Sequence, residues 1–344
     1  MKNNLKMTIV AQCIALILSG GSIAHVTAET VVKDTACNNG VSSSCSGINW
    51  YDTQKLWGLR SPAEGIDATL TGTPDTAASI YFSSEALRKD NESQTLTLSG
   101  TNLTDHLINA SYGGTATINL TNGSQVDVIE TGDDGKRTTT HILVDNSIIH
   151  GGQFDKYDNK DKAWLQGIAI YNDTKDIGDN TIDIKNGSEL NGSIVTGGAG
   201  SQVVNVKNSK IEGGAILIAG TGNNTVSIDS SIIDNRGSST ANPYPSLRAG
   251  DNAISAAGAQ TTLDVNDSTL YGNINISDVA QSMLTMVNSA VHGGININQG
   301  IVSLDATTVD DAITAKNGGT LSLGTRTSTF SNKFNGFDTL EING

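Results

Sequence analysis

Residues 204–218 read Val-Asn-Val-Lys-Asn-Ser-Lys-Ile-Glu-Gly-Gly-Ala-Ile-Leu-Ile, and much of this phrase returns at 263–276 and 284–297. Each copy has two apolar residues one apart, a small polar corner, one apolar residue, a glycine turn and another alternating pair. Alternation with period two places the apolar residues on one face of a strand, and the Asn-Ser and Gly positions bend the chain between strands. A unit this short cannot enclose a core alone, so it must stack on its neighbours. The phrase therefore predicts a β-solenoid.

The polar corner recurs along the chain at intervals of 24, 40, 22, 22, 37, 21, 18 and 19 residues. Six of these intervals lie near a common turn length, and each of the two long ones fits one turn plus an insertion. Leucine-rich repeats share the period but require a helical return, whereas here the return alternates and is rich in Gly, Asn and Thr. We therefore expect an all-β fold, a parallel β-helix of about 10–12 turns that rises about 4.8 Å per turn. The predicted corners are Asn122, Asn146, Asn186, Asn208, Ser230, Asp267, Asn288, Ala306 and Thr325.

The same alternation predicts the core. Two columns of apolar side chains should stack inward along the rod, because the first and third residues of each strand share a face. These residues are Ile182, Ile184, Val204, Val206, Val226, Ile228, Leu263, Val265, Leu284, Met286, Val302, Leu304, Leu321 and Leu323.

The N-terminus has the pattern of a secretory signal peptide. Lys2 and Lys6 precede an apolar run at 7–18, and small residues precede a cleavage position between Ala28 and Glu29. The run is too short to span a membrane. After cleavage of 1–28, 19 basic and 35 acidic residues remain, a net charge of −16. Such a surface repels nucleic acid and suits an exported protein.

Two cysteines remain in the mature chain, Cys37 and Cys45. A closely spaced pair in an exported protein favours a local disulfide. A metal site is the alternative, but no histidine or further cysteine lies near enough in sequence to complete one. We expect the disulfide and no metal or cofactor.

Two parts are predicted to follow the signal peptide. Residues 29–62 hold Trp50 and Trp57 and are predicted to form an N-terminal cap, because an open first turn exposes its core and its strand edge. Residues 63–344 form the β-helix. Insertions near 151–179 and 234–255 should leave it as surface loops, which either carry recognition or are tolerated additions.

Several residues resemble catalytic motifs but have simpler explanations. The nearest text to a serine protease signature surrounds Ser268, which lies at a repeat corner, and no Gly-x-Ser-x-Gly elbow is present. Asp133 and Asp134 could supply paired carboxylates for glycoside hydrolysis, but Gly-Asp-Asp-Gly is more typical of a turn. We assign no catalytic residue.

Candidate ligand groups are equally weak. His150 and His292 both precede Gly-Gly at equivalent repeat positions, and four intervening corners separate them, so they should not share a site. Asp155, Asp158 and Asp161 lack the spacing of a calcium loop.

The C-terminal tail, with the signal peptide and the Gly/Asn/Thr-rich turns, carries a resemblance. Its Phe330, Phe334, Phe337, Leu340 and Ile342 form a Phe-x-x-x-Phe-x-x-Phe-x-x-Leu-x-Ile pattern. Over roughly 60–344 the chain resembles the passenger domains of bacterial autotransporters of the pertactin-like type. The resemblance implies a right-handed parallel β-helix exported by a type V route to the cell surface or outer membrane.

The family continues into an autochaperone segment and a membrane β-barrel, and the sequence stops before both. We therefore expect a fragment, a truncated gene product, or a passenger whose barrel is supplied elsewhere; without a barrel the periplasm is expected.

The sequence favours a non-enzymatic surface passenger, an adhesin or a stalk for self-association. Its partner would be a ligand on a host or neighbouring cell, or a second copy of the chain. A polysaccharide-active β-helix enzyme with a groove along one face is the alternative from another class, and a non-functional remnant is a third possibility.

Overall fold

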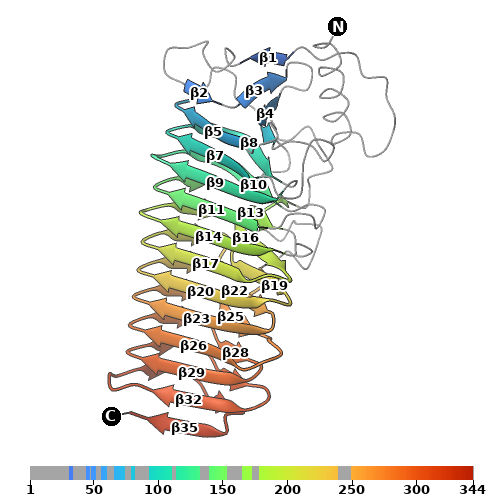
Figure 1. The fold of residues 1–344 in the computed structure, drawn as a ribbon. Helices are drawn as coiled ribbons and strands as arrows, with labels where there is room; N and C mark the ends of the chain where they lie inside the picture. The colour runs from blue at the N-terminus through green and yellow to red at the C-terminus, as the bar shows by residue number, and fades with distance from the viewer. Residues whose placement is uncertain are drawn as a thin grey trace.

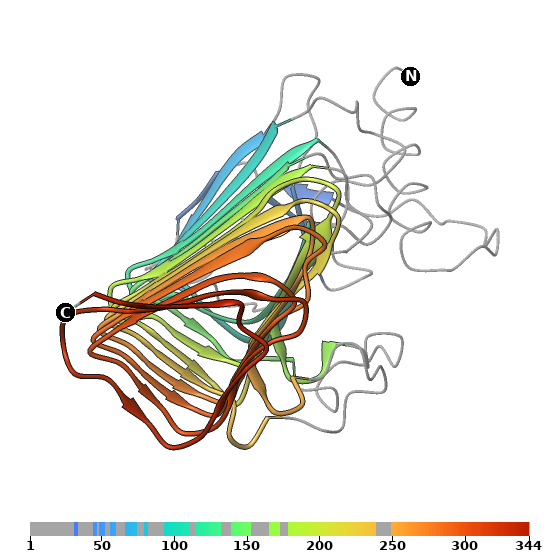
Figure 2. The same ribbon diagram turned by 90° about the horizontal axis from the view of Figure 1, so that it is seen from below.

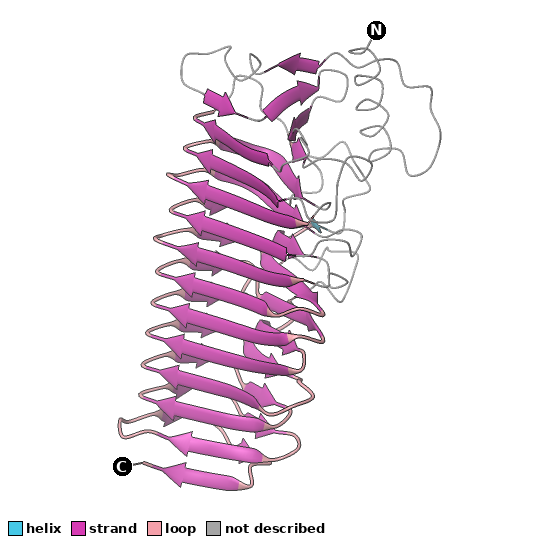
Figure 3. Cartoon of the chain, viewed as in Figure 1, coloured by secondary structure: helices cyan, strands magenta, loops and turns pink. Residues whose placement is uncertain are grey.

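The computed structural model describes residues 31–33, 44–46, 48–51, 56–59, 66–73, 79–81, 93–110, 114–131, 139–152, 165–172, 178–238 and 249–343. All named elements of this part are strands, and they wind into a right-handed parallel β-solenoid of about ten turns. Figure 1 shows the rod from the side, with the first turns beside the N-terminal segments and β35 at the opposite end. The predicted fold class is confirmed, and Figure 3 shows how strands dominate the rod.

One side of the solenoid is a 13-stranded sheet, called sheet B here. Its strands are parallel apart from β2, which pairs antiparallel with β5. Seen from the C-terminal end, sheet B forms the long flat side of the rod (Figure 2). The strands are β2 (Ser44–Ser46), β5 (Ile66–Thr71), β7 (Ser93–Ser99), β9 (Thr115–Thr121), β11 (Thr139–Asp145), β14 (Asp179–Lys185), β17 (Gln202–Lys207), β20 (Asn223–Asp229), β23 (Gln260–Asn266), β26 (Ser282–Val287), β29 (Gly300–Asp305), β32 (Gly319–Leu323) and β35 (Thr339–Ile342).

The other two sides belong to one 22-stranded sheet, called sheet A here. In its early turns β8 (Asn102–Ala110) and β10 (Gln125–Thr131) run along both sides. Later turns divide this path into two short strands. The first side holds β12 (Ile148–Ile149), β15 (Glu189–Asn191), β18 (Lys210–Glu212), β21 (Ile232–Asp234), β24 (Thr269–Tyr271), β27 (Ala290–His292), β30 (Thr308–Val309) and β33 (Thr329–Phe330). The second holds β13 (Ile168–Asn172), β16 (Ser193–Gly198), β19 (Ile216–Gly220), β22 (Asn252–Ala257), β25 (Asn273–Ile276), β28 (Ile295–Ile297), β31 (Ile313–Ala315) and β34 (Phe334–Asn335).

The core follows the predicted columns. Ile182, Val204 and Val226 are in register across β14, β17 and β20, and the column continues to Leu321. All fourteen predicted core residues are buried except Leu323, which is partly buried against the same cluster. The alternation of the sequence therefore identified the inward face of sheet B.

The corners are held by a left-handed backbone. Eight of the nine predicted corner residues, from Asn122 to Ala306, have φ between 47° and 58°, a region that asparagine, aspartate and glycine adopt most readily. Thr325 also lies in a bend, between β32 and β33, but its φ is not positive. Gly72 and Gly100, with φ of 76° and 62°, occupy the corresponding corners of earlier turns.

A ladder of hydroxyl groups follows the corner residues. The Ser209 hydroxyl accepts a hydrogen bond from the Ser188 backbone N–H at 3.2 Å and donates to the Lys207 carbonyl at 2.8 Å. The Ser209 N–H in turn donates to the Ser231 hydroxyl at 3.1 Å. Equivalent bonds recur along the rod, so these buried serines satisfy backbone groups that the corner turns away from the sheets.

A third interior feature is polar and was not predicted. At the corner between the second side of sheet A and sheet B, Thr196 donates to the Gln202 side-chain oxygen at 2.6 Å, and Asn180 donates to the same atom at 2.9 Å. The Asn172 amide reaches Thr196 at 3.3 Å. These side chains are buried within the solenoid, and the column continues to Thr261.

The N-terminal end and the insertions refine the predicted organisation. β1 (Val31–Lys33), β3 (Ile48–Tyr51) and β4 (Leu56–Leu59) form antiparallel pairs, and β4 joins β8 through β6 (Ile80–Tyr81). The predicted insertions near 151–179 and 234–255 are narrower than expected. β13 and the start of β22 lie inside them, yet both strands are part of sheet A.

Candidate functional site

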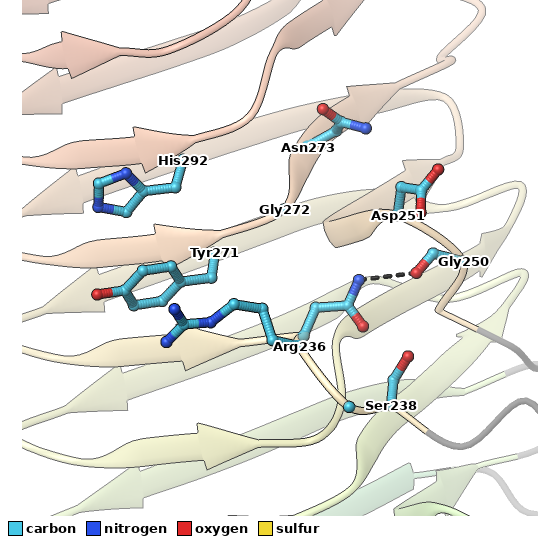
Figure 4. A pocket seen from close by; sticks show the side chains of 10 residues that line it. Arg236, Ser238, Gly250, Asp251, Tyr271, Gly272, Asn273 and His292 are labelled. Carbon is cyan, nitrogen blue, oxygen red and sulfur yellow. Dashed lines mark hydrogen bonds between the residues drawn. The ribbon is translucent and has the colours of Figure 1, made fainter.

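A groove opens on sheet A where the second predicted insertion leaves the rod (Figure 4). It has a volume of about 650 Å³ and is open to solvent. The turn after β21 forms one wall, and the corner between β24 and β25 forms the other. Its floor includes backbone at Gly237, Gly250 and Gly272, all of which have positive φ. The side chains that line it are Asn235, Arg236, Ser238, Asp251, Tyr271, Asn273 and His292.

Beside the groove, four turns are linked by one column of side chains. Asp234, Tyr271 and His292 stand in register on β21, β24 and β27. The Arg236 guanidinium carbon lies 3.5 Å from the centre of the Tyr271 ring, and the Tyr271 and His292 rings stack with centroids 4.6 Å apart. His292 Nδ1 lies 2.8 Å from the Asp310 carboxylate. Each group is thus fixed by its neighbours in adjacent turns.

The Arg236 side chain is also fixed by the Asp234 carboxylate. Its Nε donates to Asp234 Oδ1 at 2.9 Å and Nη2 donates to Oδ2 at 2.7 Å, which is a bidentate pair. These bonds lower the pKa of Asp234 and raise that of Arg236. Because the Asp234 carboxylate is largely buried while Arg236 is exposed, the pair holds the guanidinium flat against the tyrosine.

The two histidines singled out in the sequence do occupy one column. His150 follows Ile149 and His292 follows Val291, and these two residues are joined by register through β15, β18, β21 and β24. Five steps of about 4.8 Å place them about 24 Å apart. His150 Nε2 instead lies 3.0 Å from Gln125 Oε1. The expectation that the two histidines form no common site is confirmed.

The other candidate residues fall into two groups. Ser268 is buried, and its hydroxyl belongs to the corner ladder, where it donates to the Asn266 carbonyl at 2.6 Å. Cys45 lies on β2. The remaining predicted positions lie outside the described residues: the disulfide partner Cys37, the cleavage pair Ala28 and Glu29, Asp133, Asp134, Asp155, Asp158 and Asp161.

A second polar region lies on the early turns, where β8 bulges relative to β10. Asp105 in this bulge has φ of 72°, and burial lowers the pKa of the adjacent half-buried His106. Glu130 on β10 is fully buried and accepts a hydrogen bond from the Asn109 amide at 2.7 Å. Burial, with a smaller contribution from Glu130, raises the pKa of Tyr81 to about 12. Glu130 and Asn109 are buried, and Tyr81, Asp105 and His106 are only partly exposed, so the groove is the more accessible candidate.

Two further properties of the described residues concern metal binding and membrane crossing. These residues contain no group of three or more His, Cys, Asp or Glu residues placed to hold a metal ion. No helix among them is long and apolar enough to cross a membrane. The groove presents hydrogen-bonding side chains, of which Arg236, Tyr271, Asn273 and His292 are held by contacts with their neighbours.

Sequence reasoning found part of this site. It identified His292 and placed Tyr271 at the same point of the preceding repeat, but it did not pair them. The 21-residue separation was the available signal, since it matches one turn. Arg236 gave no such signal, because its position depends on the path of the chain after β21.

Comparisons of the chain with protein-family models, with curated proteins and with solved structures found no match.

Proposed function

We propose that this chain is the exported passenger of an autotransporter-like protein and acts as a non-enzymatic adhesin or self-association stalk. The observation that carries the proposal is the outer face of sheet B. Two adjacent columns of outward side chains run along it, one from Thr95 to Thr339 and the other from Thr69 to Glu341. Neither column contains a lysine or arginine, and seven of the eleven positions in the first are threonine.

This composition suits contact between large rigid surfaces. Threonine and serine lose little conformational entropy when a surface is covered, and they both donate and accept hydrogen bonds. Some side chains are already fixed to the next turn, as in the 2.7 Å bond from the Asn205 amide to Asp183. The exposed Met283 and Ile301 are neighbours in the first column and add an apolar centre.

The area of the face is sufficient for association. Twelve intervals of about 4.8 Å give a length of about 58 Å, and strands of about seven residues give a width of about 20 Å. A face-to-face contact would bury about 1,100 Å² on each partner, within the range of stable protein interfaces. Because the mature chain carries a charge of −16, association should strengthen as salt screens the repulsion.

The test is sedimentation of purified residues 29–344, together with aggregation of beads that carry them, at low and high salt. We expect Thr225→Lys combined with Thr285→Lys to abolish association, because both positions lie in the two columns of the flat face. Asn275→Lys on sheet A is the control and should leave it unchanged. A monomer at all salt concentrations, or equal effects of both variants, would contradict the proposal.

A further inference from the structure

The groove on sheet A is built to keep its polar groups in place. Tyr271 is held between Arg236 and His292. Arg236 is anchored to Asp234 in its own turn, and His292 contacts Asp310 in the next turn. Asn273 accepts a hydrogen bond from the Gly294 N–H at 2.8 Å, which fixes its side chain and leaves its amide hydrogens free to donate. Groups that are fixed before binding lose little entropy when a ligand arrives.

The arrangement also restricts how a ligand can be recognised. Arg236 covers one face of the Tyr271 ring and His292 covers the other, so a ligand meets the edge of the ring and its hydroxyl. Around that edge, Ser238 can donate and accept, and the exposed Asp251 carboxylate can only accept. A ligand that matches this set carries several groups that both donate and accept.

The charge at the groove further restricts the chemical class of the ligand. The Arg236 guanidinium is exposed, but its charge is compensated by Asp234. Among the described residues that line the groove, Asp251 is the exposed charged side chain outside such an ion pair, on a chain with net charge −16 after cleavage. An anionic ligand would be repelled there. The volume of about 650 Å³ is in the range of small-molecule sites, but polar side chains and glycine backbone dominate the lining.

We propose that this groove binds a neutral oligosaccharide through its hydroxyl groups, with Asp251, Asn273, Ser238 and the Tyr271 hydroxyl as the recognition groups. The groove lies on sheet A, away from the flat face of sheet B, so this site does not depend on self-association. A rod with both surfaces could bind a neutral glycan on another cell while neighbouring rods associate.

The test is retention of soluble residues 29–344 on immobilised cellobiose, maltose, lactose and chitobiose, with sialyllactose and oligogalacturonate as anionic probes. We expect the protein to be retained on at least one of the neutral saccharides and to bind neither of the two anionic probes. Tyr271→Phe keeps the stacked ring and removes only the hydroxyl, and Asp251→Asn keeps the shape and removes the charge. Each should weaken binding by about fivefold or more, the effect of one lost hydrogen bond.

Glu189→Gln on β15, two strands away from β21 on sheet A, is the matched control and should bind as the unmodified chain does. Unchanged thermal unfolding of all three variants separates loss of binding from loss of fold. The proposal is overturned if none of the neutral saccharides is retained, if anionic probes bind better, or if the Tyr271→Phe/Asp251→Asn double variant binds normally. The Thr225→Lys/Thr285→Lys variant should retain the saccharide, so failure of the self-association proposal leaves this one standing.

Discussion

At each corner of the rod the backbone leaves a sheet, and its N–H groups need partners that no strand supplies. The buried serine that follows the left-handed residue provides one, as Ser209 does for the N–H of Ser188. Thr101 and Thr307 stand at the same position in other turns, which indicates that the hydroxyl, rather than serine itself, is required.

Ser209→Ala should therefore lower the free energy of unfolding by about 1–3 kcal/mol, because the Ser188 N–H would be left buried without an acceptor. Ser209→Thr keeps the hydroxyl and should remain close to the unmodified chain. Denaturant unfolding with an unchanged slope measures the difference. Equal stability of the alanine and threonine variants would show that the ladder contributes nothing.

His106 provides a residue-level prediction about pH. Burial lowers its pKa below the unfolded value of 6.5, with opposing effects from Asp105 and Asp127. The folded chain then binds fewer protons than the unfolded chain in this window, so stability is fully present above pH 6.5 and is lost as the pH falls through the folded-state pKa. We expect the free energy of unfolding to decline less between about pH 7 and pH 5 in His106→Gln than in the unmodified chain. If the free energy of unfolding falls equally with pH in both chains, His106 does not contribute to the pH dependence of stability.

At the scale of the element, each strand of sheet B separates the interior from solvent by a single residue. Val206 is 1% exposed and stacks between Ile184 and Ile228, whereas Lys207 points outward and pairs with Asp229 at 3.0 Å. The ion pair lowers the pKa of Asp229, and both partners remain near the surface, so its contribution to stability is small.

Val206→Asp should destabilise the solenoid by several kcal/mol, because it places a charge in an apolar interior. Lys207→Gln is the matched control, since replacing Lys207 by an acid would also set two carboxylates against each other. Circular dichroism and denaturant unfolding of both variants test the register. Similar losses in the two variants would be incompatible with the inward column.

At the scale of the whole molecule, the two ends differ. The first turns contact the antiparallel strands β1 to β3, whereas β35 pairs only with β32 among the described residues. Leu340 and Ile342 continue the two core columns, yet they are 55% and 71% exposed, while Leu321 one turn earlier is 1% exposed. Among the described residues, β35 therefore has one neighbouring strand, whereas an interior strand of sheet B such as β32 has two.

Hydrogen–deuterium exchange of residues 29–344 at dilute concentration should be fastest in β35 and the segment before it, and slowest near β17 and β20. Backbone groups with one strand partner open without breaking the rest of the stack. If residues 320–343 exchange as slowly as β17 in a monodisperse monomer, the exposed edge described here is covered in solution.

The amino-acid sequence by itself determined the solenoid, its inward columns and the positions of the predicted corners. The physical reason is that a parallel β-helix makes its contacts between consecutive turns, so period-two alternation and a recurrent Asn-Ser corner specify most of its packing locally. The tertiary structure decided the rest. Gln202 and Thr196 become a buried polar pair only because the corner folds both inward, and β13 enters sheet A from within a segment that reads as an insertion. Arg236 reaches Tyr271 across 35 residues of sequence because β21 and β24 are neighbouring strands of sheet A, and this separation exceeds the repeat length.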